Sequence, residues 1–236
     1  MFKYTIITLL ATLALAEGKV SHGKNTREEY APRNLKSSKK KGRKANFKVT
    51  VTNLSWDQPM SPFFVAIHSD SAPRLYTFGQ PASDALALLA EEGNNADVVS
   101  MYDQMDSVLS SASVTDGLLM GGASMSFEVV APYGYQYISL ASMAVNTNDC
   151  FVALSGEHLY DGASFVLPGL DSGSEANTES CAHVPGPACQ GGGAGGRATE
   201  NAEGFVHVHR GNQGIADLGP RYDWRNPMLS VYVEEL

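Results

Sequence analysis

Three carboxylates in two short segments are the residues best suited to chemistry in this chain. Asp149 follows the polar turn Asn146–Asn148 where an apolar run begins, and Asp171 and Glu175 lie four residues apart across Gly173. Ca²⁺ binds about six to eight oxygen ligands from carboxylates, backbone carbonyls and water. We therefore expect Asp149, Asp171 and Glu175 to converge on a calcium ion. The alternative is that both segments are ordinary polar turns.

Two histidines supply an alternative metal site. His207 and His209 are separated by one residue in Phe205–His209, so on a strand both imidazoles project from one face. Imidazole binds copper and zinc well, and a similar His-x-His segment carries metal in the sandwich of copper/zinc superoxide dismutase. That enzyme needs more histidines than the others that follow Phe47, which are His68, His158 and His183. A copper- or zinc-dependent enzyme of this kind is the second interpretation.

The cysteines predict one disulfide bond. Cys181 and Cys189 flank a segment with two prolines and a glycine that bends the chain back, so their thiols can pair in an oxidising compartment. Cys150 begins an apolar run and is expected to be a small buried side chain. The sequence has no Cys-x-x-Cys, Gly-x-Ser-x-Gly or His-Glu-x-x-His motif. The first interpretation is therefore a protein that is not an enzyme.

Charge divides the chain into a basic arm and an acidic body. Residues 17–48 contain 11 Lys and Arg against 3 Asp and Glu, whereas residues 49–236 contain 5 Arg, no Lys and 22 Asp and Glu. Such a body binds nucleic acid poorly and attracts divalent cations. The arm lacks hydrophobic periodicity, so we expect it to be disordered. It is a solvated tail, a protease-processing site, or a contact for a polyanion such as a sulfated glycan through Lys39, Lys40, Lys41, Arg43 and Lys44.

The N-terminus has the pattern of a signal peptide. Lys3 precedes an apolar run, Ile6–Leu15, that is too short to span a bilayer, and Ala14-Leu15-Ala16 fits a cleavage site before Glu17. No later apolar run reaches 18 residues, so we expect no membrane span in the mature chain. The expected organisation is a secreted protein with a signal peptide at 1–16, the basic arm at 17–45 and one domain at 46–236.

The spacing of apolar residues in this domain predicts an all-β fold, an antiparallel two-sheet β-sandwich with one or two short helices. Phe47, Val49 and Val51 alternate with polar residues, as on a half-buried strand. Ser83 as N-cap and Gly93 as C-cap predict a helix over 85–92. A second short helix is expected over 97–105. Seven further strands are expected between turn residues, over 63–68, 125–130, 136–145, 150–154, 164–167, 205–209 and 228–234.

Several segments, taken in order, match the pattern of a known family. They are VTVTNLS at 49–55, QPMSP at 58–62 with His68, FGQPAS at 78–83, LAEEG at 89–93, MAVNTNDCFV at 143–152, LDSGSEAN at 170–177, GFVHVHRG at 204–211 and YDWRNP at 222–227. Over about residues 47–233 the chain thus resembles the spondin N-terminal domain family, the module of F-spondin and mindin.

This resemblance implies a C-two-like, synaptotagmin-type topology and a role in extracellular adhesion or matrix binding. It also implies that the calcium carboxylates of the family correspond to Asp149, Asp171 and Glu175. Two residues depart from the family pattern, because Cys150 replaces the aromatic residue that usually follows the first Asp, and Glu175 replaces an Asp. The implied function is that of a secreted calcium-binding module whose partner is an extracellular glycan or a cell-surface or matrix protein.

Overall fold

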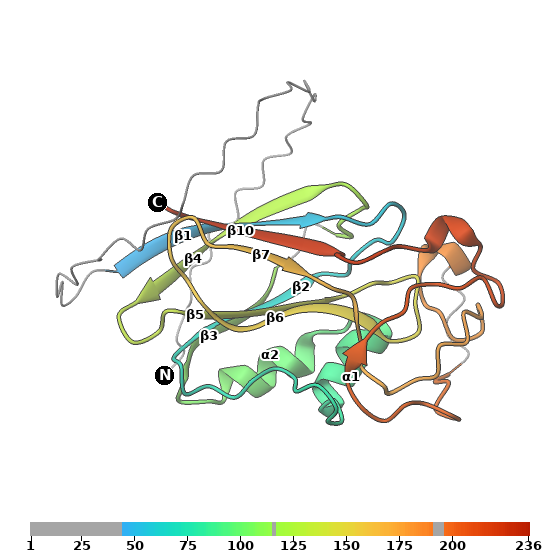
Figure 1. The fold of residues 1–236 in the computed structure, drawn as a ribbon. Helices are drawn as coiled ribbons and strands as arrows, with labels where there is room; N and C mark the ends of the chain where they lie inside the picture. Colours follow the sequence, from blue (N-terminus) through green and yellow to red (C-terminus); the bar gives the residue numbers. More distant parts are fainter. Residues whose placement is uncertain (1–43, 115–116, 191–195) are drawn as a thin grey trace, which may run out of the picture.

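The computed structural model describes residues 44–114, 117–190 and 196–236 (Figure 1). In these residues ten strands form two antiparallel sheets, accompanied by two α-helices. This confirms the all-β, two-sheet sandwich with one or two short helices, whereas the C-two-like topology stays a prediction. The expected signal peptide at 1–16 and the arm up to residue 43, with Lys39, Lys40, Lys41 and Arg43, lie outside the described residues. Lys44 begins strand β1.

Four strands form the smaller sheet, in the order β4-β1-β10-β7. In β1, Phe47, Val49 and Val51 are each at most 4% exposed, because the alternation directs them into the space between the sheets. The bounds of the four strands are β1 Lys44–Asn53, β4 Ser124–Pro132, β7 Ser164–Leu167 and β10 Leu229–Glu235.

Six strands form the larger sheet, in the order β3-β2-β5-β6-β8-β9. Both faces of this sheet are covered, and strand β2 is accordingly buried at every position instead of alternating. The bounds of the six strands are β2 Phe63–His68, β3 Val108–Val114, β5 Tyr137–Met143, β6 Cys150–His158, β8 Leu170–Asp171 and β9 His207–Val208.

Two helices, α1 Asp84–Glu92 and α2 Ala96–Asp103, cover the outer face of the larger sheet (Figure 1). Helix α1 begins and ends as predicted, because Ser83 Oγ accepts a hydrogen bond from the Leu86 N–H at 3.2 Å and Gly93 adopts a left-handed conformation. The described residues therefore form three layers. One apolar core lies between the sheets and a second lies between the larger sheet and the helices.

Two strands were not expected from the sequence, and a third is shorter than expected. Strand β3 has the sequence VLSSASV, in which small hydroxyl residues hide any apolar alternation, and β8 has only two residues. The strand expected over 205–209 is reduced to β9, since Gly204 and Gly211 have positive φ angles of 79° and 85° that turn the chain on both sides.

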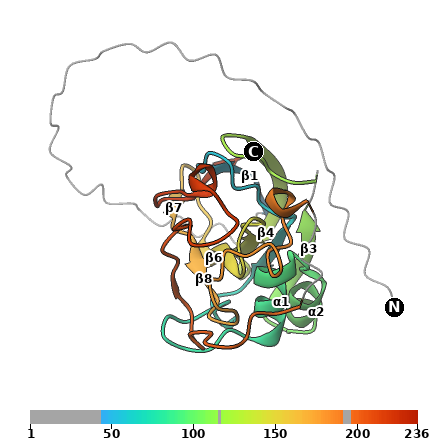
Figure 2. The same ribbon diagram turned by 90° about the vertical axis from the view of Figure 1, so that its right-hand side faces the viewer.

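Long segments gather at the end of the sandwich that faces the viewer in Figure 2. They connect β8 to β9 and β9 to β10, and they include the 3-10 turns Pro187–Cys189 and Pro220–Tyr222. Cys181 and Cys189 form the predicted disulfide bond there, which confirms that pairing. Within the described ranges, neither helix has the length and apolarity needed to cross a membrane.

Candidate metal centre

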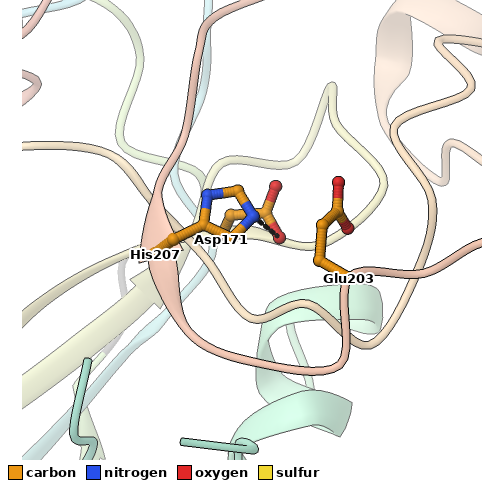
Figure 3. A group of neighbouring side chains, drawn as sticks. All are labelled: Asp171, Glu203 and His207. Atoms are coloured by element: carbon orange, nitrogen blue, oxygen red, sulfur yellow. Dashed lines mark ion pairs between the residues drawn. The ribbon is translucent and has the colours of Figure 1, made fainter. Parts of the chain in front are cut away.

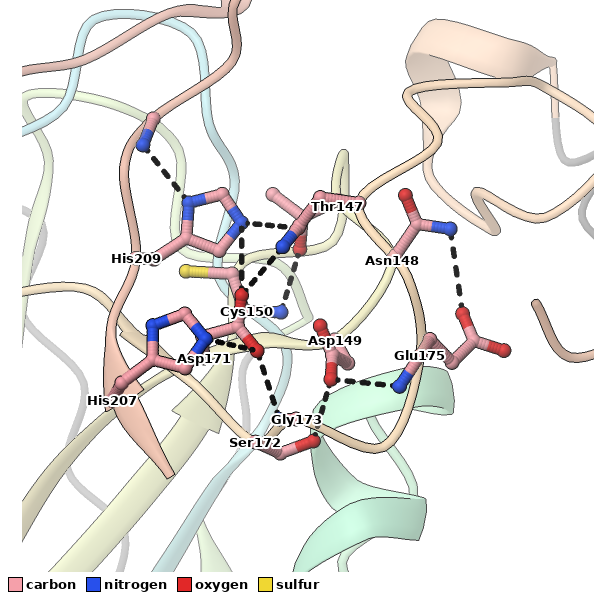
Figure 4. A network of polar contacts seen from close by, with 12 residues as sticks. Thr147, Asn148, Asp149, Cys150, Asp171, Ser172, Gly173, Glu175, His207 and His209 are labelled. Carbon is pink, nitrogen blue, oxygen red and sulfur yellow. Dashed lines mark hydrogen bonds and ion pairs between the residues drawn. The ribbon is translucent and has the colours of Figure 1, made fainter. Parts of the chain in front are cut away.

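Asp171 lies at the centre of a row of three strands at this loop end. Strand β8 is between β6 and β9, with Asp171 directly opposite Cys150 on one side and His207 on the other. Residues opposite one another in an antiparallel sheet project from the same face. The short strands therefore place the carboxylate of Asp171 beside the imidazole of His207 (Figure 4).

A glycine brings the β9 segment close to Asp171. Gly173 has a φ of +70°, and a Cβ atom there would lie 2.4 Å from the carbonyl oxygen of Phe205. The carbonyl oxygen of Gly173 accepts a hydrogen bond from the Gly204 N–H at 2.8 Å. Only glycine permits both this conformation and this approach, so Gly173 positions residues 203–207 against the turn that follows β8.

Asp149 is fully buried, and its two oxygens have very different surroundings. Oδ2 accepts hydrogen bonds from Ser172 Oγ at 2.8 Å and from the N–H groups of Ser174 at 2.9 Å and Glu175 at 3.1 Å. Oδ1 is buried and has no hydrogen-bond partner. Almost all buried polar atoms are hydrogen-bonded, so this oxygen needs an explanation, and a bound cation is one.

The carboxyl groups of Asp149 and Asp171 are subject to opposing effects, because burial disfavours their charged forms and hydrogen bonds favour them. Burial, followed by the charge of Asp171, raises the pKa of Asp149 to about 7. Burial also raises the pKa of Asp171, although hydrogen bonds from Asn177 Nδ2 at 2.6 Å and the Gly173 N–H at 2.8 Å favour its charged form. Two neighbouring buried carboxylates need a counter-charge, which is either a proton or a metal ion.

Glu175, the third expected calcium ligand, directs its carboxylate elsewhere. Oε1 accepts a hydrogen bond from the Ala198 N–H at 3.0 Å, and Oε2 accepts one from Asn148 Nδ2 at 3.4 Å. Figure 4 shows the side chain pointing away from Asp171, so that Glu175 contributes its backbone N–H to Asp149 instead. The structure thus brings together two of the three expected carboxylates, because the Ala198 N–H and the Asn148 side chain bind the third.

His209, expected to pair with His207 on a metal, has both ring nitrogens occupied. Nδ1 accepts a hydrogen bond from the Gly211 N–H at 3.0 Å, so Nε2 carries the proton and donates it to Asn177 Oδ1 at 2.7 Å. Burial lowers the pKa of His209 to about 3, and its ring stacks on Trp224 with centroids 5.0 Å apart. The His207–His209 pair therefore does not offer two free metal ligands in this structure.

His207 has one free ring nitrogen and lies near Glu203, a residue that was not expected to be part of a site. Its Nε2 atom has no hydrogen bond and lies 3.5 Å from Asp171 Oδ1. Ligand atoms of Asp171, Glu203 and His207 all lie within 4.8 Å of one another, and no other group of His, Cys, Asp and Glu in the described ranges meets this criterion (Figure 3). The signal for Glu203 is its position four residues before His207, next to a turn-forming glycine.

Cys150 has no role as a nucleophile at this centre. The residue is buried, as expected, and is not part of the disulfide bond. Burial, followed by the charges of Asp171 and Asp149, raises the pKa of the thiol well above its ordinary value. Cys150 therefore stays protonated and packs as an apolar side chain against the core between the sheets.

The chain was also compared with known proteins. No protein-family model matches it, and no curated protein matches it significantly. The resemblance to the spondin N-terminal domain family therefore stays a prediction that rests on the ordered segments alone.

Proposed function

We propose that this chain is a secreted, calcium-binding β-sandwich module that binds an extracellular glycan or protein. The observation that carries the calcium assignment is the buried Oδ1 atom of Asp149, which lacks a hydrogen bond. The charge of Asp171 contributes to the raised pKa of this carboxyl group. A hard cation bound at this atom would be coordinated by oxygen ligands, as Ca²⁺ requires.

The residues around this oxygen fit a calcium ion in part. Asp149 and Asp171 would hold the ion, and backbone carbonyls and water would complete its coordination. A bound ion would neutralise two carboxylates that otherwise repel one another, and so would fasten the turn before β6 to the turn after β8. Glu175 would support the site through its N–H bond to Asp149 Oδ2 at 3.1 Å.

Secretion and partner binding have separate support. Secretion is supported by the expected signal peptide and by the disulfide bond, which persists in oxidising compartments. An exposed aromatic side chain supports partner binding, since Trp56 is 83% exposed. Trp56 lies on the loop between β1 and β2, and Gln58 Oε1 in that loop accepts a hydrogen bond from the Asn146 N–H at 3.2 Å, just before Asp149. The glycan or protein partner itself is proposed from the family resemblance.

The calcium assignment is tested by the melting of the purified mature chain. Saturating Ca²⁺ should raise the melting temperature relative to EDTA, because an ion that binds only the folded state stabilises it by mass action. Asp149→Asn should abolish this rise. Asp70→Asn, which alters an exposed carboxylate on the β2–β3 connection, should leave it intact. Equal melting of the native chain in calcium and in EDTA would refute a calcium site.

The partner assignment is tested with glycan arrays and immobilised matrix proteins, probed in calcium and in EDTA. Binding should require calcium, and Trp56→Ala should weaken it at least about tenfold, as truncation of an anchoring aromatic residue does. Tyr133→Ala is the matched control, because Tyr133 is 76% exposed but lies on the β4–β5 turn at the opposite end of the sandwich. Calcium binding without any calcium-dependent partner would leave a purely structural ion and overturn the partner assignment.

A further inference from the structure

The hydrogen bonding of His207 defines which of its nitrogens carries a proton. Nδ1 lies 3.0 Å from the carbonyl oxygen of Val208, and a carbonyl can only accept, so Nδ1 is the protonated nitrogen. The Nε2 atom of a neutral His207 then presents a lone pair. A backbone bond from one ring nitrogen is also the usual way in which a metal-binding histidine is oriented.

This lone pair faces two carboxylates instead of a hydrogen-bond donor. Nε2 is 3.5 Å from Asp171 Oδ1, and an oxygen of Glu203 completes the group of atoms within 4.8 Å (Figure 3). Nε2 is buried and has no hydrogen bond. Electron-rich atoms that converge in this way repel one another unless a proton or a metal cation lies between them.

The donor set favours a transition metal over calcium. One imidazole nitrogen with two carboxylates suits Zn²⁺ and its neighbours in the first transition series, whereas Ca²⁺ takes oxygen ligands. Zn²⁺ needs ligand atoms at about 2.0 to 2.2 Å from the ion, and the 3.5 Å between His207 Nε2 and Asp171 Oδ1 leaves room for an ion bound to both atoms. Glu203 is exposed, so its side chain can rotate to reach the ion.

We infer that Asp171, Glu203 and His207 form a binding site for a divalent transition-metal ion such as Zn²⁺, with Asp171 shared between this ion and the proposed calcium position. A cavity of about 370 Å³ is lined by Glu203, His207, Arg210 and Gln213 among others. Water from this cavity would complete the coordination of the ion. The inference can hold without the calcium assignment, because Glu203 and His207 take no part in the latter, although Asp171 would belong to both sites.

The inference is tested with the metal-free mature chain, Zn²⁺ and the spectroscopic probe Co²⁺. Calorimetry should show one Zn²⁺ per chain, and Co²⁺ should give visible absorption bands that Zn²⁺ abolishes. His207→Gln and Glu203→Gln should each weaken Zn²⁺ binding at least about tenfold and change the Co²⁺ spectrum. Two separate variants are used so that a folding defect in one does not decide the result.

Matched controls separate this site from the calcium site and from adventitious binding. His158→Gln removes an exposed histidine at the far end of β6 and should leave Zn²⁺ binding unchanged. Asp149→Asn should abolish the calcium response but retain Zn²⁺ binding, whereas His207→Gln should do the reverse. Zn²⁺ affinity that is absent, or that is the same in His207→Gln as in the native chain, would overturn the inference and leave His207 as a protonated partner of Asp171.

Discussion

His68 and His207 lie at opposite ends of the larger sheet and begin with the same hydrogen bond. Each donates from Nδ1 to the carbonyl oxygen of the following residue, at 2.8 Å for His68 and 3.0 Å for His207. At His68, Nε2 accepts a hydrogen bond from Ser139 Oγ at 2.9 Å, and the Gly156 N–H donates to the same hydroxyl. At His207, Nε2 has no hydrogen bond and faces Asp171.

His68 is therefore a structural histidine, whereas His207 has a ring nitrogen that is free to bind a ligand. His68 ends a short chain of hydrogen bonds in which every donor has an acceptor, so it needs nothing from outside the protein. A second pair of buried residues shows the same contrast. Glu179 accepts backbone N–H groups of Gln213 and Ile215 on its two oxygens, whereas Asp149 has all its donors on one oxygen. In each of the two comparisons, the residue with incomplete hydrogen bonding, His207 or Asp149, is the one that lies beside Asp171.

The largest expected effect is a loss of stability with rising pH when cations are removed. The folded-state pKa of Asp149 is about 7, above its ordinary value of 3.8, so the folded protein holds a proton that the unfolded chain has released. This contribution is complete below about pH 4 and is lost as the pH rises through 7. In EDTA, urea unfolding should show a decrease of about 2 to 3 kcal/mol between pH 5 and 8. Asp149→Asn should remove most of this decrease, and a native chain that gains stability over the range would contradict it.

The next largest effect on stability is expected at His68, whose hydrogen bonds are complete. His68→Gln should lower the free energy of unfolding by about 2 kcal/mol, because Ser139 Oγ and the Ser69 carbonyl lose a buried partner. The same denaturant titration measures this loss. The Ca²⁺ and Zn²⁺ responses should stay as in the native chain, since His68 is at the other end of the sheet. A changed cation response in this variant would show that the two ends are coupled.

A somewhat smaller effect is expected from the glycine that shapes the incomplete centre. Gly173→Ala should cost about 1 to 2 kcal/mol more than Gly204→Ala, because both residues have positive φ but only Gly173 has no room for a Cβ atom. Thermal or denaturant unfolding of the two variants measures the difference. Gly173→Ala should also weaken Zn²⁺ binding by displacing residues 203–207. Equal costs for the two substitutions would mean that the close approach to Phe205 is not needed.

The smallest effect on stability is expected at His207. In EDTA at pH 8, His207→Gln should change the free energy of unfolding by less than about 0.5 kcal/mol, because Nε2 has no hydrogen bond to lose and the Nδ1 bond to the Val208 carbonyl is exposed to solvent. Denaturant titration beside His68→Gln gives the direct contrast between the two histidines. A loss at His207 as large as that at His68 would show that His207 is a structural residue.

Local signals predicted most of the framework of this protein. The caps Ser83 and Gly93 defined helix α1, and the alternation of Phe47, Val49 and Val51 defined β1, because both patterns depend on residues close in sequence. Strand β3 escaped prediction because its serines leave no alternation, and β8 because two residues carry no period. These strands are specified by the neighbours they pair with, which a local pattern does not reveal.

The centre itself could be predicted only in part. Asp149 and Asp171 were recognised because carboxylates beside polar turns suit a hard cation. Periodicity placed His207 and His209 on one face, but it says nothing of the Gly211 N–H and Asn177 side chain that occupy His209. The surroundings of Glu175 and Glu203 could not be predicted for a similar reason, because the Ala198 contact and the close approach at Gly173 are made between segments far apart along the chain.

Strand β9 is the outermost strand of its sheet and is held to β8 over only two residue pairs. Backbone hydrogen bonds of Gly204, Val206 and His209 also hold this segment. Where such a short edge opens locally, its amide hydrogens exchange with solvent while the remainder of the protein stays folded. An ion bound by both Asp171 and His207 would join β8 to β9 directly, so loss of the proposed ion is expected to make local opening of β9 more frequent. Deuterium uptake confined to the β9 segment would then report how much metal is available to the protein.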